Sequence, residues 1–170
     1  MVHNFVSVIT RHWVSLVGAI VALVALVASV LGAVSCSMSR TAKCLCGQLS
    51  ITVHGDTHGA GVCHCLACQA RTGSAFAFLA GFSEPYEVVG RASEYVHTGD
   101  AGTKSRFRFC PVCGSNVFHT EEGTTGHVSV AVGCFGDPSF RAPDDSVYDC
   151  RRHAWVTLPP GCVAFDKDPP

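Results

Sequence analysis

Residues 110–114 read Cys-Pro-Val-Cys-Gly, and this short stretch decides how the rest of the chain must be arranged. Two cysteines three positions apart, with a proline between them, form a tight turn that directs two thiolates at one metal ion. The glycine allows the positive φ that turns backbone N–H groups toward sulfur. A structural zinc ion takes four ligands, so the turn predicts two further cysteines elsewhere in the chain.

Residues 44–47, which read Cys-Leu-Cys-Gly, supply the natural complement. Positions i and i+2 of an extended segment face the same side, so both thiols can reach one ion. We therefore expect one closed tetrahedral zinc site that ties most of the domain together. A disulfide is the alternative if the domain is exported. The four expected ligands are Cys44, Cys46, Cys110 and Cys113.

A third cluster, Cys-His-Cys-Leu-Ala-Cys, occupies residues 63–68. Three thiolates, from Cys63, Cys65 and Cys68, can hold one zinc ion and leave its fourth position open, as in catalytic sites. Such a zinc is a poor activator of water but accepts a soft ligand such as a substrate thiolate. A second structural metal and a redox thiol group are the alternatives. His64 is a candidate fourth ligand, although we expect its side chain to point the other way.

Composition excludes several classes of protein. Charged residues make up 15% of the 170 residues, and the mean hydropathy is +0.30, which excludes a disordered chain. The formal net charge of −1 argues against nucleic-acid binding by bulk charge. Eleven cysteines, an odd number, cannot all pair within one chain. Those without ligand spacing are expected to be small packed or idle side chains. They are Cys36, Cys134, Cys150 and Cys162.

The first 37 residues differ from everything after them. Residues 13–34 carry no formal charge and are long enough to cross a membrane. Three interpretations are open: a membrane anchor, an export signal, or a leader added by a misassigned start, since Met38 begins a natural alternative. If the anchor is real, Arg40 and Lys43 favour a cytoplasmic location for the domain that follows.

From residue 41 onward the sequence predicts a mainly β domain. Polar and apolar residues alternate with period two, or form short apolar runs, as in half-buried and buried strands. We see no helical pattern beyond the leader, and we expect residues 159–170 to lie over the surface. The strand candidates are residues 48–53, 75–82, 105–109 and 127–132.

The three cysteine motifs, in this order and at these separations, resemble the glutathione-dependent formaldehyde-activating enzyme family, which includes the centromere protein V-like domain. The resemblance covers residues 41–165. It implies an Mss4-like β-tent of small antiparallel sheets organised around two zinc ions, structural on the first four cysteines and catalytic on Cys63, Cys65 and Cys68. It also implies a carbon–sulfur lyase that joins formaldehyde to the thiol of glutathione. This sequence departs from the family in two respects. Family members often have a basic residue at the position of Ala70, and the hydrophobic leader is not typical of them.

Two functions follow. The first is a zinc-dependent carbon–sulfur lyase whose partners are a thiol and a small aldehyde; the second is a non-catalytic zinc module that binds a protein partner. In the enzyme, Arg71, or Arg106 and Arg108, could receive a substrate carboxylate, the alternative being solvated surface charges. No nucleic-acid partner is expected, and membrane contact would come through residues 13–34. The expected organisation is a leader (1–37), a zinc domain (41–165) and a tail (166–170).

Overall fold

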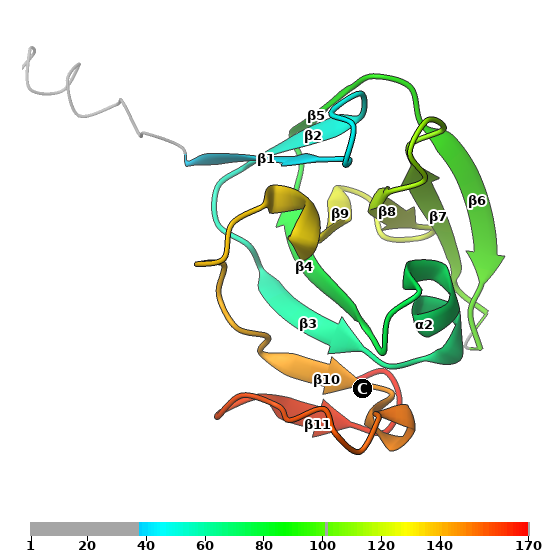
Figure 1. Cartoon of the computed structure of the whole chain (residues 1–170), viewed down its shortest axis with the longest axis vertical. Coiled ribbons are helices and arrows are strands. Elements are labelled where there is room, and N and C mark those ends of the chain that lie inside the picture. The colour runs from blue at the N-terminus through cyan, green and yellow to red at the C-terminus, as the bar shows by residue number, and fades with distance from the viewer. Residues whose placement is uncertain (1–37, 101, 170) are drawn as a thin grey trace, which may run out of the picture. The chain divides into compact units, whose positions relative to one another are not determined.

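The computed structural model describes residues 38–100 and 102–169, which form a mainly β protein (Figure 1). The strands are β1 (Ser39–Lys43), β2 (Ser50–His54), β3 (Gly59–Cys63), β4 (Ala77–Ser83), β5 (Tyr86–Val89), β6 (Ser93–Thr98), β7 (Lys104–Phe109), β8 (Asn116–Glu121), β9 (His127–Ala131), β10 (Asp145–Val147) and β11 (Val163–Phe165). The described residues also contain α2 (Leu66–Thr72) and two 3₁₀ turns, η1 (Val132–Phe135) and η2 (Asp149–Arg151).

The strands form two sheets. A three-stranded antiparallel sheet has the order β1-β2-β5, and an eight-stranded sheet has the order β11-β10-β3-β4-β9-β8-β7-β6. At one edge of the larger sheet, β3 pairs with β10 and β10 with β11 in parallel. The expectation of small antiparallel sheets is therefore wrong at this edge. Strand β11 comes from residues 159–170, where we expected only surface chain and no strand (Figure 1).

The four strand candidates correspond to β2, β4, β7 and β9. In β2 buried and partly buried residues alternate along the whole strand: Ile51 and Val53 are fully buried, whereas Ser50, Thr52 and His54 are only partly buried. Strand β9 repeats the pattern with Val128 and Val130. Period-two patterning was informative because each of these strands turns one face toward the core.

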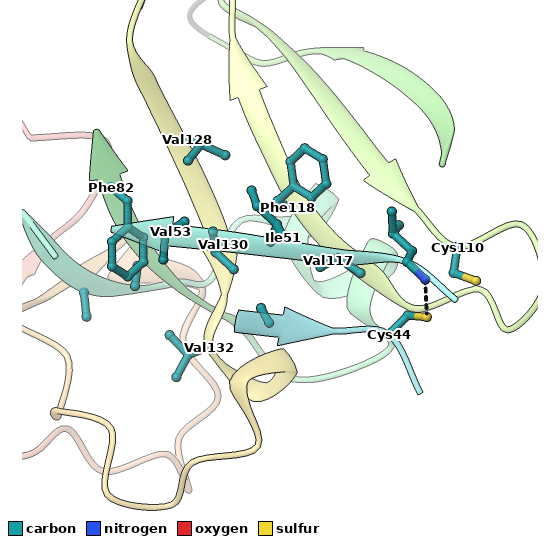
Figure 2. Packing of buried hydrophobic residues seen from close by; sticks show 14 residues of the cluster. Cys44, Ile51, Val53, Phe82, Cys110, Val117, Phe118, Val128, Val130 and Val132 are labelled. Atoms are coloured by element: carbon teal, nitrogen blue, oxygen red, sulfur yellow. Dashed lines mark hydrogen bonds between the residues drawn. The ribbon is translucent and has the colours of Figure 1, made fainter. Parts of the chain in front are cut away.

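The core lies between the two sheets and reaches the first cysteine cluster. Figure 2 shows Ile51 and Val53 of β2 beside Val117, Val128 and Val130 of the larger sheet. Cys44 and Cys110 lie at one end of this cluster and are themselves buried, at 3% and 0% exposure. These two thiols are thus an extension of the core, and the backbone around them is fixed by the same packing.

Helix α2 contradicts the expectation that no helix follows the leader. It has seven residues, too few to show an amphipathic period. Its ends are defined locally: the Cys65 Sγ accepts a hydrogen bond from the Cys68 N–H at the start. Gly73, with φ of 65°, ends it in the left-handed conformation.

Residues 1–37, 101 and 170 lie outside the described part of the chain, and so do the expected membrane segment 13–34 and Cys36. Within residues 38–100 and 102–169, no helix has the length and apolar character needed to span a membrane.

His119 on β8 gives a test of this packing. The residue is 5% exposed and its ring centroid lies 4.9 Å from that of Phe107. Burial, helped by the nearby Arg71 charge, lowers the pKa of His119 to about 3. The unfolded chain therefore binds a proton that the folded chain excludes, and stability is lost as the pH falls below about 6.5.

We expect His119→Phe to reduce this acid sensitivity. Relative to pH 7.5, the loss attributable to His119 at pH 5 is about 2 kcal/mol. Denaturant unfolding of the wild type and the variant at both pH values measures it, with metal content checked in each sample. Equal losses in the two proteins would contradict a neutral buried imidazole.

Candidate metal centres

The first cysteine cluster joins two loops that are distant in the sequence. The sulfurs of Cys44, Cys46, Cys110 and Cys113 all lie within 4.8 Å of one another. One loop connects β1 to β2 and the other connects β7 to β8. Gly114 has φ of 74° and donates its N–H to the Cys110 carbonyl at 2.9 Å, which closes the second turn as predicted.

The sulfur spacing fits a tetrahedral ion. With Zn–S bonds of 2.3 Å, the sulfurs of a four-thiolate zinc lie about 3.8 Å apart. The Cys46 sulfur lies 3.6 Å from that of Cys44 and 3.7 Å from that of Cys110. These distances are far longer than the S–S bond of a disulfide. The donor set and its spacing therefore favour zinc over the disulfide alternative.

Neighbouring groups donate hydrogen bonds to three of these four sulfurs. The N–H of Leu49 donates to the Cys44 Sγ at 3.2 Å (Figure 2). The amide of Gln48 donates to the Cys110 Sγ at 3.3 Å. Hydrogen bonds from the hydroxyl and then the backbone N–H of Ser115 lower the pKa of Cys113 to about 5. Hydrogen bonds to the charged form favour ionisation, which metal binding requires.

The second cluster is local, because its thiols come from the end of β3 (Cys63), the N-cap of α2 (Cys65) and the first turn of α2 (Cys68). The sulfurs of Cys63, Cys65 and Cys68 also lie within 4.8 Å of one another. Hydrogen bonds from the other two thiols lower the pKa of Cys65 to about 2. Hydrogen bonds with the Cys65 and Cys68 thiols, and then burial, raise the pKa of Cys63. Among the described residues, the group contains no fourth His, Cys, Asp or Glu ligand.

Comparison with known proteins bears on the same motifs. The family model described as "glutathione-dependent formaldehyde-activating enzyme" matches residues 39–151, which include all seven clustered cysteines. The chain belongs to this family. A crystal structure of a Rhodobacter sphaeroides protein is similar at 24% identity and a TM-score of 0.43, covering 55% of this chain and 85% of that one. No curated protein matches the chain.

Two cysteine clusters that could hold metal ions lie within the residues that the family model matches. His64 is not part of either group. It is fully buried, its Nδ1 lies 3.3 Å from the Ala75 carbonyl oxygen, and its ring packs against Phe76. Burial lowers the pKa of His64, which favours the neutral imidazole. Its Nδ1 is turned toward the Ala75 carbonyl, and neither ring nitrogen joins the three sulfurs.

Arg71 links the second cluster to the larger sheet. Its Nη2 lies 3.6 Å from the Cys68 Sγ, its Nη1 donates to the Asn116 Oδ1, and its guanidinium carbon lies 4.5 Å from the Phe107 ring centroid. The sequence left Arg71 as a residue that receives a substrate carboxylate or as a solvated charge, and did not indicate these three neighbours. The guanidinium is placed to offset negative charge on the Cys68 sulfur.

Arg106 and Arg108 lie elsewhere. They alternate with Phe107 along β7, so they point to the opposite face from Arg71. Both pair with Glu94, and Arg106 also pairs with Glu122. The structure therefore favours solvated surface charges over a carboxylate-binding role for these two residues.

None of the remaining described cysteines joins a cluster. The Cys134 thiol donates to the Asn116 carbonyl at 3.5 Å, and burial raises the pKa of Cys134. Cys150 is exposed and donates to the Asp166 carbonyl at 3.2 Å. Cys162 is partly buried. The interpretation of all three as packed or idle side chains agrees with these positions.

The two clusters should differ in their effect on stability. Cys110→Ser removes a buried ligand that joins distant loops, and structural zinc contributes on the order of 10 kcal/mol, so we expect misfolding. Cys65→Ser affects one local turn and should leave a folded domain. Thermal unfolding followed by circular dichroism distinguishes them. Comparable destabilisation in both variants would contradict the division into a closed and an open site.

Arg71→Gln should weaken metal binding at the second cluster by about tenfold, because groups that hydrogen-bond metal ligands typically matter to this degree. Chelator competition measures the affinity, and the first cluster serves as an internal reference. Arg106→Gln is the matched control, because it removes the same charge from the opposite face of β7. An unchanged affinity in Arg71→Gln, or an equal loss in Arg106→Gln, would refute this role.

Proposed function

We propose that the protein is a zinc-dependent carbon–sulfur lyase that joins a thiol, glutathione-like in its chemistry, to a small aldehyde such as formaldehyde. Cys44, Cys46, Cys110 and Cys113 would hold a structural zinc on a β-tent scaffold. Cys63, Cys65 and Cys68 would hold a second zinc, giving two ions per chain. Because both clusters need reduced thiols, we expect the domain to work in the cytoplasm.

One observation carries this proposal: in a chain of this family, three thiols from a single short segment converge without a fourth protein ligand among the described residues. An open coordination position is the feature that separates catalytic from structural zinc. When bound, the zinc would supply a position that keeps a substrate thiol in its ionised form. The thiolate sulfur then adds to the carbonyl carbon of the aldehyde, and the carbonyl oxygen takes up the proton that the thiol released.

The protein's own groups would set the conditions for this addition. Three thiolates on one divalent ion leave a net charge of −1, and the Arg71 guanidinium beside Cys68 offsets it. The charge of an incoming thiolate is then less strongly repelled. The turn between β3 and α2 fixes the three ligands because Cys65 also caps the helix. We expect most of the rate acceleration to come from holding the thiolate and the aldehyde close together in the correct orientation.

A binding module is the second candidate. Leu45 and Val112, one in each loop of the first cluster, are 89% and 65% exposed. Contiguous exposed apolar patches mark protein-binding surfaces, and these two side chains lie on the loops that the first cluster brings together. The test below separates the two functions, because a pure binding module needs no open thiol site.

We expect cobalt-substituted full-length protein to change its visible spectrum when a small thiol is added, as sulfur enters the open position. Cys68→Ser should abolish the change. His64→Gln should retain it, because neither ring nitrogen of His64 joins the three sulfurs. Turnover of thiol and formaldehyde to the hydroxymethyl thioether should follow the same pattern. A spectrum unaffected by any thiol would mean a closed second site, and the binding module would replace the enzyme.

A further inference from the structure

A groove lies on the face of the larger sheet that points away from the core. It has a volume of about 340 Å³ and runs along β3, between β10 on one side and β4 and β9 on the other. Ala60 and Val62 of β3 point into the core. The alternate positions, Gly59, Gly61 and Cys63, therefore face the groove.

Glycines create the space in this groove. Gly59 is paired with Gly81 of β4, and Gly61 with Asp145 of β10. A Cβ on Gly61 would overlap the Asp145 carboxylate, so that side chain can lie over β3 only because residue 61 is glycine. A Cβ on Gly81 would come within 2.7 Å of the His127 ring. The Asp145 and His127 side chains therefore occupy space that a side chain at position 61 or 81 would otherwise fill.

Asp145 places an uncompensated negative charge in this groove. Its carboxylate forms no hydrogen bond or ion pair with another described residue, unlike Asp144, which pairs with Arg141 and accepts the Ala60 N–H at 3.0 Å. Burial, and then the neighbouring Asp144, raise the pKa of Asp145. No lysine or arginine of residues 38–100 and 102–169 lines the groove. Besides Asp145, the titratable side chains in the described lining are His58, Cys63 and His127, so a cationic ligand that entered the groove would meet an unpaired carboxylate there.

The second cysteine cluster lies at the end of the same groove. Cys63 is the last residue of β3 and is paired with Val147, while Asp145 is paired two residues back with Gly61. Two residues along a strand correspond to about 7 Å. A small molecule with its sulfur at the cluster and its cationic group a few bonds away would reach Asp145.

We propose that this groove selects aminothiols, that is, thiols with an ammonium group close to the sulfur, and that Asp145 is the counter-ion for that group. The inference rests on the proposed function, because it assumes that the thiol binds at Cys63, Cys65 and Cys68. It narrows the glutathione-like thiols of the proposed function to those without carboxylates: glutathione carries two carboxylates beside its ammonium group, and the described lining offers no lysine or arginine to receive them, only His58 and His127.

Four thiols test this selection on the cobalt-substituted full chain: 2-aminoethanethiol, 2-mercaptoethanol, 3-mercaptopropionate and glutathione. Their dissociation constants come from titration of the visible spectrum, which does not depend on turnover. A hydrogen bond between charged groups in a partly desolvated site favours the cationic thiol over the neutral one by about tenfold or more. The two anionic thiols should bind more weakly than the neutral one.

One variant and one control test whether Asp145 causes the preference for the cationic thiol. Asp145→Asn keeps the shape of the side chain and should reduce the preference for the cationic over the neutral thiol to within about twofold, while the neutral thiol binds as before. Glu87→Gln is the matched control, because Glu87 is an exposed carboxylate on β5 of the other sheet. It changes the net charge equally and should leave the preference intact.

The outcomes separate the two proposals. If thiols change the spectrum but bind irrespective of charge, or glutathione binds tighter than 2-aminoethanethiol, the aminothiol inference is overturned and the lyase proposal stands. The same holds if Asp145→Asn retains the full preference. If no thiol changes the spectrum, both proposals are overturned together.

Discussion

The fold depends on the convergence of four thiols from two loops that are 64 residues apart at Cys46 and Cys110. Cys44 and Cys110 are buried in the core, so this convergence fixes the end of β1 against the end of β7 from within the packed interior. Four ionised thiols at such distances repel one another, and their approach is favourable only with a cation between them. A metal ion held here would therefore couple metal binding to core packing, because Cys44 and Cys110 belong to both the cluster and the core.

The second cluster is constrained differently. Its three thiols come from one short segment and need no distant loop to meet, so their geometry is set by β3, by the cap of α2 and by Arg71. Arg71 is the one long-range element, because it reaches Asn116 of β8 and the Phe107 ring of β7. A site whose ligands are close together in the sequence contributes little to holding the fold, so it can leave a coordination position open. The first cluster joins distant loops through all four of its thiols.

The sequence was informative wherever a local pattern has a local cause. Cysteine spacing and the glycine after Cys113 predicted which thiols meet, because turn geometry follows from a few adjacent residues. Alternation predicted β2 and β9 for the same reason. Helix α2 was missed because seven residues show no period, and the parallel β3–β10–β11 edge was missed because a three-residue strand has no pattern of its own. The neighbours of Arg71 were not predicted, since only the tertiary structure shows that Cys68, Asn116 and Phe107 surround it.

The groove could not be predicted for a related reason, and it links the fold to the chemistry. Its glycines have no periodic signal, and Asp145 lies over Gly61 only because a parallel strand from late in the chain pairs with β3. Asp145 lies beside β3, Cys63 ends β3, and Arg71 of α2 lies 3.6 Å from the Cys68 sulfur of the same cluster. A thiolate entering this groove meets repulsion from Asp145 unless it brings its own positive charge. The closer that charge lies to the sulfur, the more of the repulsion it cancels, because Coulomb interactions weaken with distance. The same register that places Cys63 at the end of β3 therefore determines which thiols the cluster can accept.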